Sequence, residues 1–172
     1  LKSGDYSTNG VKPSISPSMD IQVSSNFERA LFDAYGRDGA AVAALMDELK
    51  SGGFHIGQGA LQMLRQSFTS GRCSEDETRA TIARTYAETG EILCPHSAVG
   101  VKVAAEHLGT TPMITLATAH PAKFPDAVQA AMGTRPGLPP RMADLFDRPE
   151  RVTRVTNDLG ALQALIRERI AR

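Results

Sequence analysis

The chain has 172 residues, enough for one domain with a sizeable hydrophobic core and, at most, a small appendage. Its 19 basic and 19 acidic side chains cancel, so no net positive charge attracts nucleic acid or an anionic membrane. The longest apolar run is far shorter than the roughly 20 residues that cross a bilayer, which excludes a membrane span. Cys73 and Cys94 lack zinc-ligand spacing, so we expect reduced thiols in a cytoplasmic protein without a metal site.

The first 18 residues have the composition of a loop. Glycine and proline recur in them, serines and threonines lie between, and the apolar residues show no periodicity. A polar loop of this length is usually either a functional mobile segment or a flexible linker. The chain also begins at Leu1 without an initiator methionine, so we expect it to be part of a longer polypeptide. We interpret residues 1–18 as a mobile polar loop.

Residues 19–133 are expected to form the main helical part of the chain. After a brief extended segment at 19–23, apolar residues recur at three- and four-residue spacing in six stretches, which predicts six helices. Two of these helices begin with the Ser-x-x-Glu spacing of a capping box, at Ser25 and Glu28 and at Ser74 and Glu77. The helices are expected at about residues 26–35, 38–51, 58–69, 74–88, 97–108 and 125–132.

Two short apolar runs within this part are expected to be buried strands. Ile92–Cys94 and Met113–Ala117 are flanked by turn residues and are too short for helices. A helix separates them, which predicts a β-α-β unit with parallel strands. The fold class is therefore α/β, mostly helical with a few short parallel strands.

Residues 134–172 are interpreted as a loop followed by a C-terminal helical extension. Prolines and glycines crowd residues 133–140, which excludes regular structure there. Residues 151–156 alternate valine with polar residues and are weakly strand-like. Asn157 and Asp158 then cap a terminal helix with an apolar face.

Polar side chains follow each of the two expected strands. Thr118, His120 and Lys123 come after the second strand, and His96 and Ser97 come after the first. Ligands of open α/β sheets sit beyond the carboxyl ends of the strands, so both junctions are candidate parts of one site. The simpler interpretation is that these residues cap turns or lie in solvated loops.

A third candidate is the helix start at residues 24–29. The backbone amides of a helix N-terminus bind anions, and Ser24, Ser25, Asn26 and Arg29 lie at that position in the sequence. The simpler interpretation is an ordinary capped helix.

Three segments together resemble the threonine synthases of bacteria and fungi. They are SMDIQVSSNFER at residues 18–29, PHSAVG at 95–100 and ATAHPAKF at 117–124. They occur in the order found in the family, and the resemblance runs from residue 1 to the C-terminus. This implies the C-terminal part of a pyridoxal-phosphate enzyme of the tryptophan-synthase-β fold type, fold type II. Such an enzyme converts O-phospho-L-homoserine and water to L-threonine and phosphate, the last step of threonine biosynthesis.

The resemblance also implies that part of the active site is missing. The family's Schiff-base lysine and its glycine-rich cofactor loop precede the first residue of this chain. Among the five lysines here, none has the sequence context of that lysine; they are Lys2, Lys12, Lys50, Lys102 and Lys123. We therefore expect no primary catalytic residue in this segment and no activity from it alone. The N-terminal part of the same enzyme would be its partner.

Residue by residue, Thr118 matches the hydroxyl that faces the pyridine nitrogen of pyridoxal phosphate in this fold type, with Thr115 as the second choice. A neutral hydroxyl leaves that nitrogen unprotonated, which favours elimination and replacement over transamination, while the cofactor supplies the chemistry. The substrate phosphate needs an ammonium, a guanidinium or a helix N-terminus. The substrate-binding candidates are His96, Ser97, His120, Lys123, Ser24, Ser25, Asn26 and Arg29.

Two other functions were weighed against this one. A noncatalytic helical binding or assembly domain, with residues 1–18 docking a partner, fits the helical content. A small α/β hydrolase that uses Ser97 and His96 is disfavoured because adjacent residues at a helix start align poorly as nucleophile and base. The chain also lacks the G-x-S-x-G turn of such hydrolases.

Overall fold

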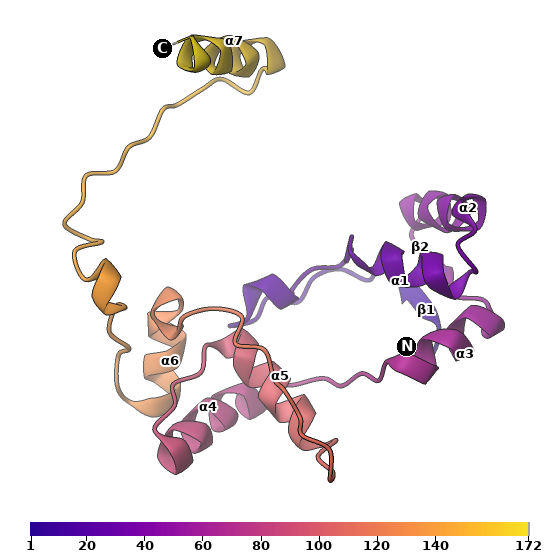
Figure 1. The fold of residues 1–172 in the computed structure, drawn as a ribbon, viewed down its shortest axis with the longest axis horizontal. Helices are drawn as coiled ribbons and strands as arrows, with labels where there is room; N and C mark the ends of the chain where they lie inside the picture. Colours follow the sequence, from indigo (N-terminus) through magenta and orange to yellow (C-terminus); the bar gives the residue numbers. More distant parts are fainter. Residues whose placement is uncertain (172) are drawn as a thin grey trace. The chain divides into compact units, whose positions relative to one another are not determined.

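The computed structural model describes residues 1–171. Its contacts divide the chain into two compact units, Leu1–Gly137 and a smaller unit that begins at Leu138. The first unit contains two separate hydrophobic clusters. Figure 1 labels the helices and strands that carry them.

The first cluster joins a two-stranded antiparallel sheet to three helices. β1 (Asp5–Ser7) pairs with β2 (Gly53–His55), with Tyr6 opposite Phe54. The Tyr6 ring stacks on Phe27 at 5.7 Å and on Phe54 at 5.0 Å between ring centroids. The helices are α1 (Phe27–Ala34), α2 (Gly39–Lys50) and α3 (Gln58–Ser67), and their buried faces carry Leu31, Val42, Leu45, Leu61 and Leu64.

The second cluster is a packing of α4 (Glu75–Thr89), α5 (Pro95–Ala105) and α6 (Pro125–Met132). Ile82, Ala98 and Val128 form its centre, and all three are fully buried. The small side chain of Ala98 allows the first turn of α5 to lie directly against α4 and α6, because a larger residue would need more space at this point. This packing fixes the N-terminal end of α5, where the candidate site lies.

Helix ends agree with the sequence patterns at most positions. Ser74 and Glu77 form both bonds of the expected capping box, and Glu77 accepts from the Ser74 N–H at 2.7 Å. The Ser74 bonds and the nearby Lys102 lower the pKa of Glu77 to about 2. The expected box at Ser25 and Glu28 is not formed. Asn26, the residue before α1, already has helical dihedral angles, and so the extended cap residue that a capping box requires is absent there.

The two strands expected at residues 92–94 and 113–117 are not formed, which corrects the prediction from the sequence. Neither segment belongs to a sheet, and within residues 1–171 the only sheet is the β1–β2 pair. The expected parallel β-α-β unit is therefore not formed. The physical reason is that a strand requires a hydrogen-bonded neighbour, and the described part of the chain places none beside these segments. Ile114 and Leu116 are 84% and 75% exposed, although their pattern is that of a buried strand.

Three further segments differ from the sequence expectations. Residues 151–156 are irregular rather than a strand, and residues 19–23 contain the end of a 3-10 helix, η1 (Pro17–Met19). β1 lies in the N-terminal stretch that has loop composition, where the sequence predicts no strand.

Hydrogen bonds attach the segment 14–20 to the second cluster. The Asp20 carboxylate accepts from the Ser14 N–H and hydroxyl, each at 2.7 Å, which closes this segment on itself. The Ile15 N–H donates to Glu75 on α4 at 3.2 Å, and the Ser18 N–H donates to His96 on α5 at 3.0 Å.

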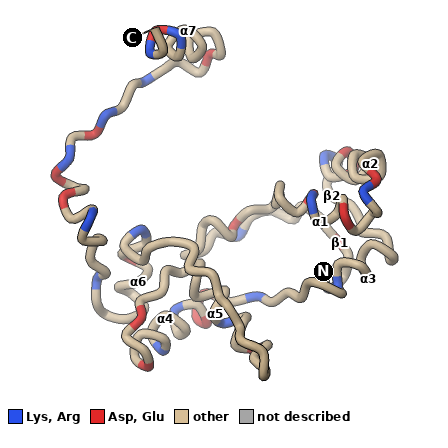
Figure 2. The backbone as a smooth tube through the Cα atoms, in the orientation of Figure 1, with Lys and Arg blue, Asp and Glu red and all other residues tan. Residues whose placement is uncertain are grey.

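The second unit contains a 3-10 helix, η3 (Pro140–Met142), and one α-helix, α7 (Leu159–Ile170). The Asp158 carboxylate accepts from the Ala161 N–H at 2.7 Å, which caps α7 as the sequence predicted. Figure 2 shows basic and acidic residues interspersed along the backbone, consistent with the zero formal net charge. No helix within residues 1–171 is both long and apolar enough to cross a lipid bilayer.

Candidate functional site

The candidate site is built around the first turn of α5. Pro95 occupies the first helical position, where its fixed φ suits a helix and its missing N–H costs no hydrogen bond. Cys94 is the cap residue, and its sulfur accepts from the Ser97 N–H at 3.4 Å. His96 and Ser97 are buried, with exposed fractions of 6% and 3%. The sequence PHS therefore presents its polar side chains at a helix start, in a buried setting.

Thr118 lies directly against Ser97. The Thr118 N–H donates to Ser97 Oγ at 3.1 Å, and the two hydroxyl oxygens are 3.5 Å apart. The Thr118 residue is exposed, so its hydroxyl is accessible and is not enclosed by aliphatic side chains. The sequence predicts that polar groups of the two junctions meet, and in the structure Ser97 and Thr118 do so.

Thr115, the second choice, has a different environment. Its side-chain methyl lies close to Gly100 on α5, so that a Cβ added to Gly100 would be 3.1 Å from it. Thr115 is thus half-buried against the helix rather than joined to the polar group at Ser97. The geometry favours Thr118 as the residue with an accessible hydroxyl.

Cys94 is a third member of this polar group. Its buried sulfur lies 3.2 Å from Ser97 Oγ and 3.9 Å from Thr118 Oγ1. Burial raises the pKa of the Cys94 thiol, but bonds from Ser97, Thr118 and the Ala119 backbone outweigh it and leave the pKa below its ordinary value. The sequence patterns predict only a buried thiol at Cys94, not a member of the site. Its position directly before a helix-starting proline was the available signal that it caps the helix.

His96 connects the other two sequence segments to this helix start. Its Nε2 accepts from the Ser18 N–H at 3.0 Å, and its ring lies 4.6 Å from the Phe124 ring, tilted by 51°. Within the described residues, the buried Nδ1 has no hydrogen-bond partner. Ser18 and Phe124 are the ends of the first and third segments quoted above, so all three segments meet at the start of α5. The contact of Ser18 with this helix start was not visible in the sequence.

His120 and Lys123 lie on the exposed side of the same loop. His120 caps the 3-10 helix η2 (Pro121–Lys123), because its Nδ1 accepts from the Ala122 N–H at 3.2 Å. The Lys123 ammonium lies 5.8 Å from the centre of the Phe124 ring. Both side chains are exposed and close to the Thr118 segment in the chain.

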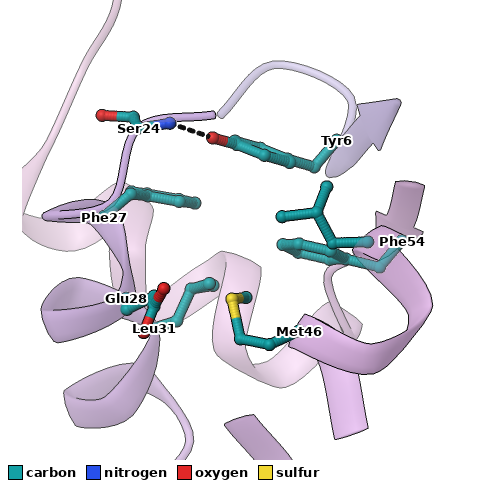
Figure 3. A pocket seen from close by; sticks show the side chains of 8 residues that line it. Tyr6, Ser24, Phe27, Glu28, Leu31, Met46 and Phe54 are labelled. Carbon is teal, nitrogen blue, oxygen red and sulfur yellow. Dashed lines mark hydrogen bonds between the residues drawn. The ribbon is translucent and has the colours of Figure 1, made fainter. Parts of the chain in front are cut away.

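The candidate residues at 24–29 lie in the first cluster, where Ser24 contacts Tyr6. The Ser24 N–H donates to the Tyr6 hydroxyl at 2.8 Å, as Figure 3 shows, and the Ser24 hydroxyl lies 2.9 Å from Asn26 Oδ1. Ser25 and Arg29 are exposed. Among residues 1–171, no hydrogen bond or ion pair joins this group to Ser97 or Thr118.

Protonation of His96 is expected to weaken the bond that attaches residues 14–20. Burial, and then the nearby Lys123, lower the pKa of His96 below its ordinary value of 6.5, while Asp20 raises it. A lowered pKa in the folded state means that the unfolded chain binds the proton more readily. The stability contributed by neutral His96 is therefore complete above about pH 6.5 and declines as the pH falls below it. NMR titration of the His96 imidazole should give a midpoint below 6.5.

The same titration should report on the backbone bond. We expect the protection factor of the Ser18 amide against hydrogen exchange to fall with the His96 titration, because imidazolium has no lone pair to accept from it. A His96→Gln variant should lose this pH dependence. A His96 midpoint at or above 6.5 would contradict the predicted shift.

Comparison with known proteins places this arrangement in a class. The structure matches pyridoxal-phosphate-bound threonine synthase from Brucella melitensis with a TM-score of 0.89 and 53% identity, over 97% of this chain and 36% of that one. It matches threonine synthase from yeast with a TM-score of 0.81 and 32% identity, over 99% of this chain and 39% of that one. The chain therefore has the fold of the C-terminal part of a fold type II pyridoxal-phosphate enzyme.

The sequence comparisons identify the family within that class. A family model described as "Threonine synthase, C-terminal" matches residues 97–166. Threonine synthase of Pseudomonas aeruginosa is 48% identical over 165 residues, which cover 94% of this chain and 35% of that relative. The chain belongs to the threonine synthase family and corresponds to its C-terminal portion, about a third of the length of this relative.

Proposed function

We propose that this chain is the C-terminal part of an enzyme that converts O-phospho-L-homoserine and water to L-threonine and phosphate with pyridoxal phosphate as cofactor. The observation that carries the proposal is the contact between Thr118 and Ser97 at the start of α5, supported by the family membership. The proposed enzyme is a carbon–oxygen lyase acting on phosphate, and we propose that it works in the cytoplasm.

The residues at this position are suited to the cofactor. Thr118 presents an accessible neutral hydroxyl, and its polar neighbours are a second hydroxyl and a thiol. Within residues 1–171, the side-chain hydrogen bonds of Thr118, Ser97 and Cys94 join these three residues to one another and to backbone groups, and to no carboxylate. When bound, pyridoxal phosphate supplies an electron sink for the elimination and replacement of the substrate phosphate.

Each residue of the site has a proposed role that its environment allows. The Thr118 hydroxyl donates a hydrogen bond to the pyridine nitrogen and leaves it without a positive charge. Lys123 and His120, exposed on the adjoining loop, are candidates to bind the substrate phosphate. The start of α1, with Ser24, Ser25, Asn26 and Arg29, is a second candidate for the same role. His96 and Ser97 are buried, so they act by holding the site rather than by direct contact with solvent-borne substrate.

The N-terminal part of the same enzyme is the proposed partner. It would supply the lysine that binds the cofactor covalently. The exposed apolar residues Met113, Ile114 and Leu116 support this proposal, because such a run gains stability only when another segment covers it.

The experiment compares a polypeptide of these 172 residues with the complete enzyme. We expect the complete enzyme to release phosphate from O-phospho-L-homoserine and to produce threonine in equal amount. We expect the 172-residue polypeptide to do neither and to show no absorbance band of covalently bound pyridoxal phosphate. Turnover by the short polypeptide would contradict the assigned division of the active site.

A control separates this proposal from a noncatalytic binding domain. Mixing the 172-residue polypeptide with a separately expressed N-terminal part should restore phosphate release if both contribute to one active site. Thr118→Val in the complete enzyme should lower the rate, because the variant keeps the volume of the side chain but lacks its hydroxyl. Full activity of this variant would exclude Thr118 from the site.

A further inference from the structure

We propose that Cys94 and Ser97 are positioning residues that fix the direction of the Thr118 hydroxyl hydrogen, so that it points away from α5 and toward the pyridine nitrogen. This inference rests on the proposed function, because it assigns a role toward the cofactor. It concerns two buried residues beside Thr118.

The starting point is the sulfur of Cys94. It accepts from the Ser97 N–H at 3.4 Å. A thiol has one hydrogen to donate, and Ser97 Oγ is the nearest acceptor, at 3.2 Å. The Cys94 thiol therefore donates to the Ser97 hydroxyl.

The hydrogen-bonding positions of the Ser97 hydroxyl are then all occupied. Its oxygen accepts from the Cys94 thiol and from the Thr118 N–H, which lies at 3.1 Å. A hydroxyl oxygen has two lone pairs, so both are occupied and only its hydrogen remains. The remaining polar atom within reach is Thr118 Oγ1 at 3.5 Å, and Ser97 donates to it. Burial of Ser97 excludes water as a competing partner.

These hydrogen bonds limit the orientation of the Thr118 hydroxyl. Because its oxygen accepts from Ser97, its own hydrogen cannot point at Ser97. The other acceptor within reach, the Cys94 sulfur at 3.9 Å, is a weak one, so the hydrogen can turn to the exposed side when a stronger acceptor binds there. A pyridine nitrogen without a proton is an acceptor and needs a donor opposite it. If Thr118 instead donated to Ser97, a lone pair of the Thr118 oxygen would face the lone pair of the pyridine nitrogen, and no hydrogen bond could form between them. The chain from Cys94 through Ser97 to Thr118 thus prepares the donor before the cofactor binds.

The test uses the complete enzyme with pyridoxal phosphate labelled with ¹⁵N in the ring. Two quantities are measured: the dissociation constant of the cofactor and the chemical shift of the ring nitrogen, which responds to the hydrogen bond it accepts. Thr118→Val should change both. Ser97→Ala should weaken cofactor binding by about 3- to 10-fold and move the shift part of the way toward that of Thr118→Val.

A double variant tests whether Ser97 acts through Thr118. In the Thr118→Val background, Ser97→Ala should cause no further change in the shift, because the hydroxyl that it orients is absent. A further change of the same size as in the wild type would overturn the inference, since Ser97 would then have only a structural role. Cys94→Ser, which retains a donor, should stay close to the wild type, and Cys94→Ala should move the shift in the direction of Ser97→Ala.

The outcomes distinguish the inference from the proposed function. If Thr118→Val changes both quantities but neither Ser97→Ala nor Cys94→Ala changes the shift, the inference is wrong and the proposed function stands. If Thr118→Val itself leaves both unchanged, the proposed role of Thr118 fails and the inference fails with it. Circular dichroism of each variant shows whether it is folded, and the two Cys94 variants test the same hydrogen-bond chain if Ser97→Ala does not fold.

Discussion

Gly53→Ala is expected to be among the most destabilising single substitutions in this chain, with a loss of about 3–5 kcal/mol in the free energy of unfolding. Gly53 lies in β2 with φ at +148°, in a region that residues with a side chain rarely adopt. A Cβ at this position would lie 2.6 Å from the Ser7 Cα and 2.7 Å from the Tyr6 carbonyl oxygen. Both atoms belong to the backbone of β1, so the pairing of the two strands would have to open.

The neighbouring glycine provides a matched control. Gly52 has φ at +123°, also a position that favours glycine, but a Cβ added to it would meet no atom within 4 Å. Gly52→Ala should therefore cost only the backbone strain, about 1–2 kcal/mol. The two variants differ by the collision with β1. Urea unfolding of the 172-residue polypeptide, followed by circular dichroism, measures the difference, and equal losses would show that the collision is relieved by a small shift.

The sheet that Gly53 belongs to illustrates what the sequence could not predict. Tyr6 and Phe54 pair across the sheet although 47 residues separate them, and residues 5–7 lie in a stretch with the composition of a loop. Local patterns contain no information about such a pair, because its stability comes from the stacking of Tyr6 on Phe27 and Phe54. The helices were predictable for the opposite reason, since spacing and capping residues such as Asp38 and Ser74 act locally.

The candidate site was predictable in part. Ser97 and Thr118 each follow an apolar run, and the prediction that they share a site rested on these runs being neighbouring parallel strands. The two residues do meet, but the strands are not formed. The role of Ser18 was not predictable, because only the folded chain brings its N–H to His96. The role of Cys94 is local, and its one signal in the sequence was its position directly before Pro95. The substrate-binding candidates stay predictions, including the two groups proposed to bind phosphate.

Ile82→Ala is expected to cost about 2–5 kcal/mol of unfolding free energy, whereas Ile114→Ala is expected to cost less than about 0.5 kcal/mol in the 172-residue polypeptide. Ile82 is fully buried and packs against Ala98 and Val128, so truncation leaves a cavity next to the turn that holds Ser97. Ile114 is 84% exposed, and truncation there removes few contacts. The same substitution is thus expected to have a large effect on stability at Ile82 and a small one at Ile114.

In the complete enzyme, we expect Ile114→Ala to lower the free energy of unfolding strongly, whereas the effect of Ile82→Ala should stay the same. The pattern of residues 113–117 is that of a strand buried on both faces, and a strand forms only when a neighbouring strand supplies hydrogen bonds. If the N-terminal part of the enzyme supplies that neighbour, Ile114→Ala should cost about 2–5 kcal/mol there, similar to Ile82→Ala. Paired unfolding measurements on both proteins test this. A small effect of Ile114→Ala in the complete enzyme would mean that the apolar run stays exposed, and the prediction of a buried strand would be wrong for the whole protein as well as for this segment.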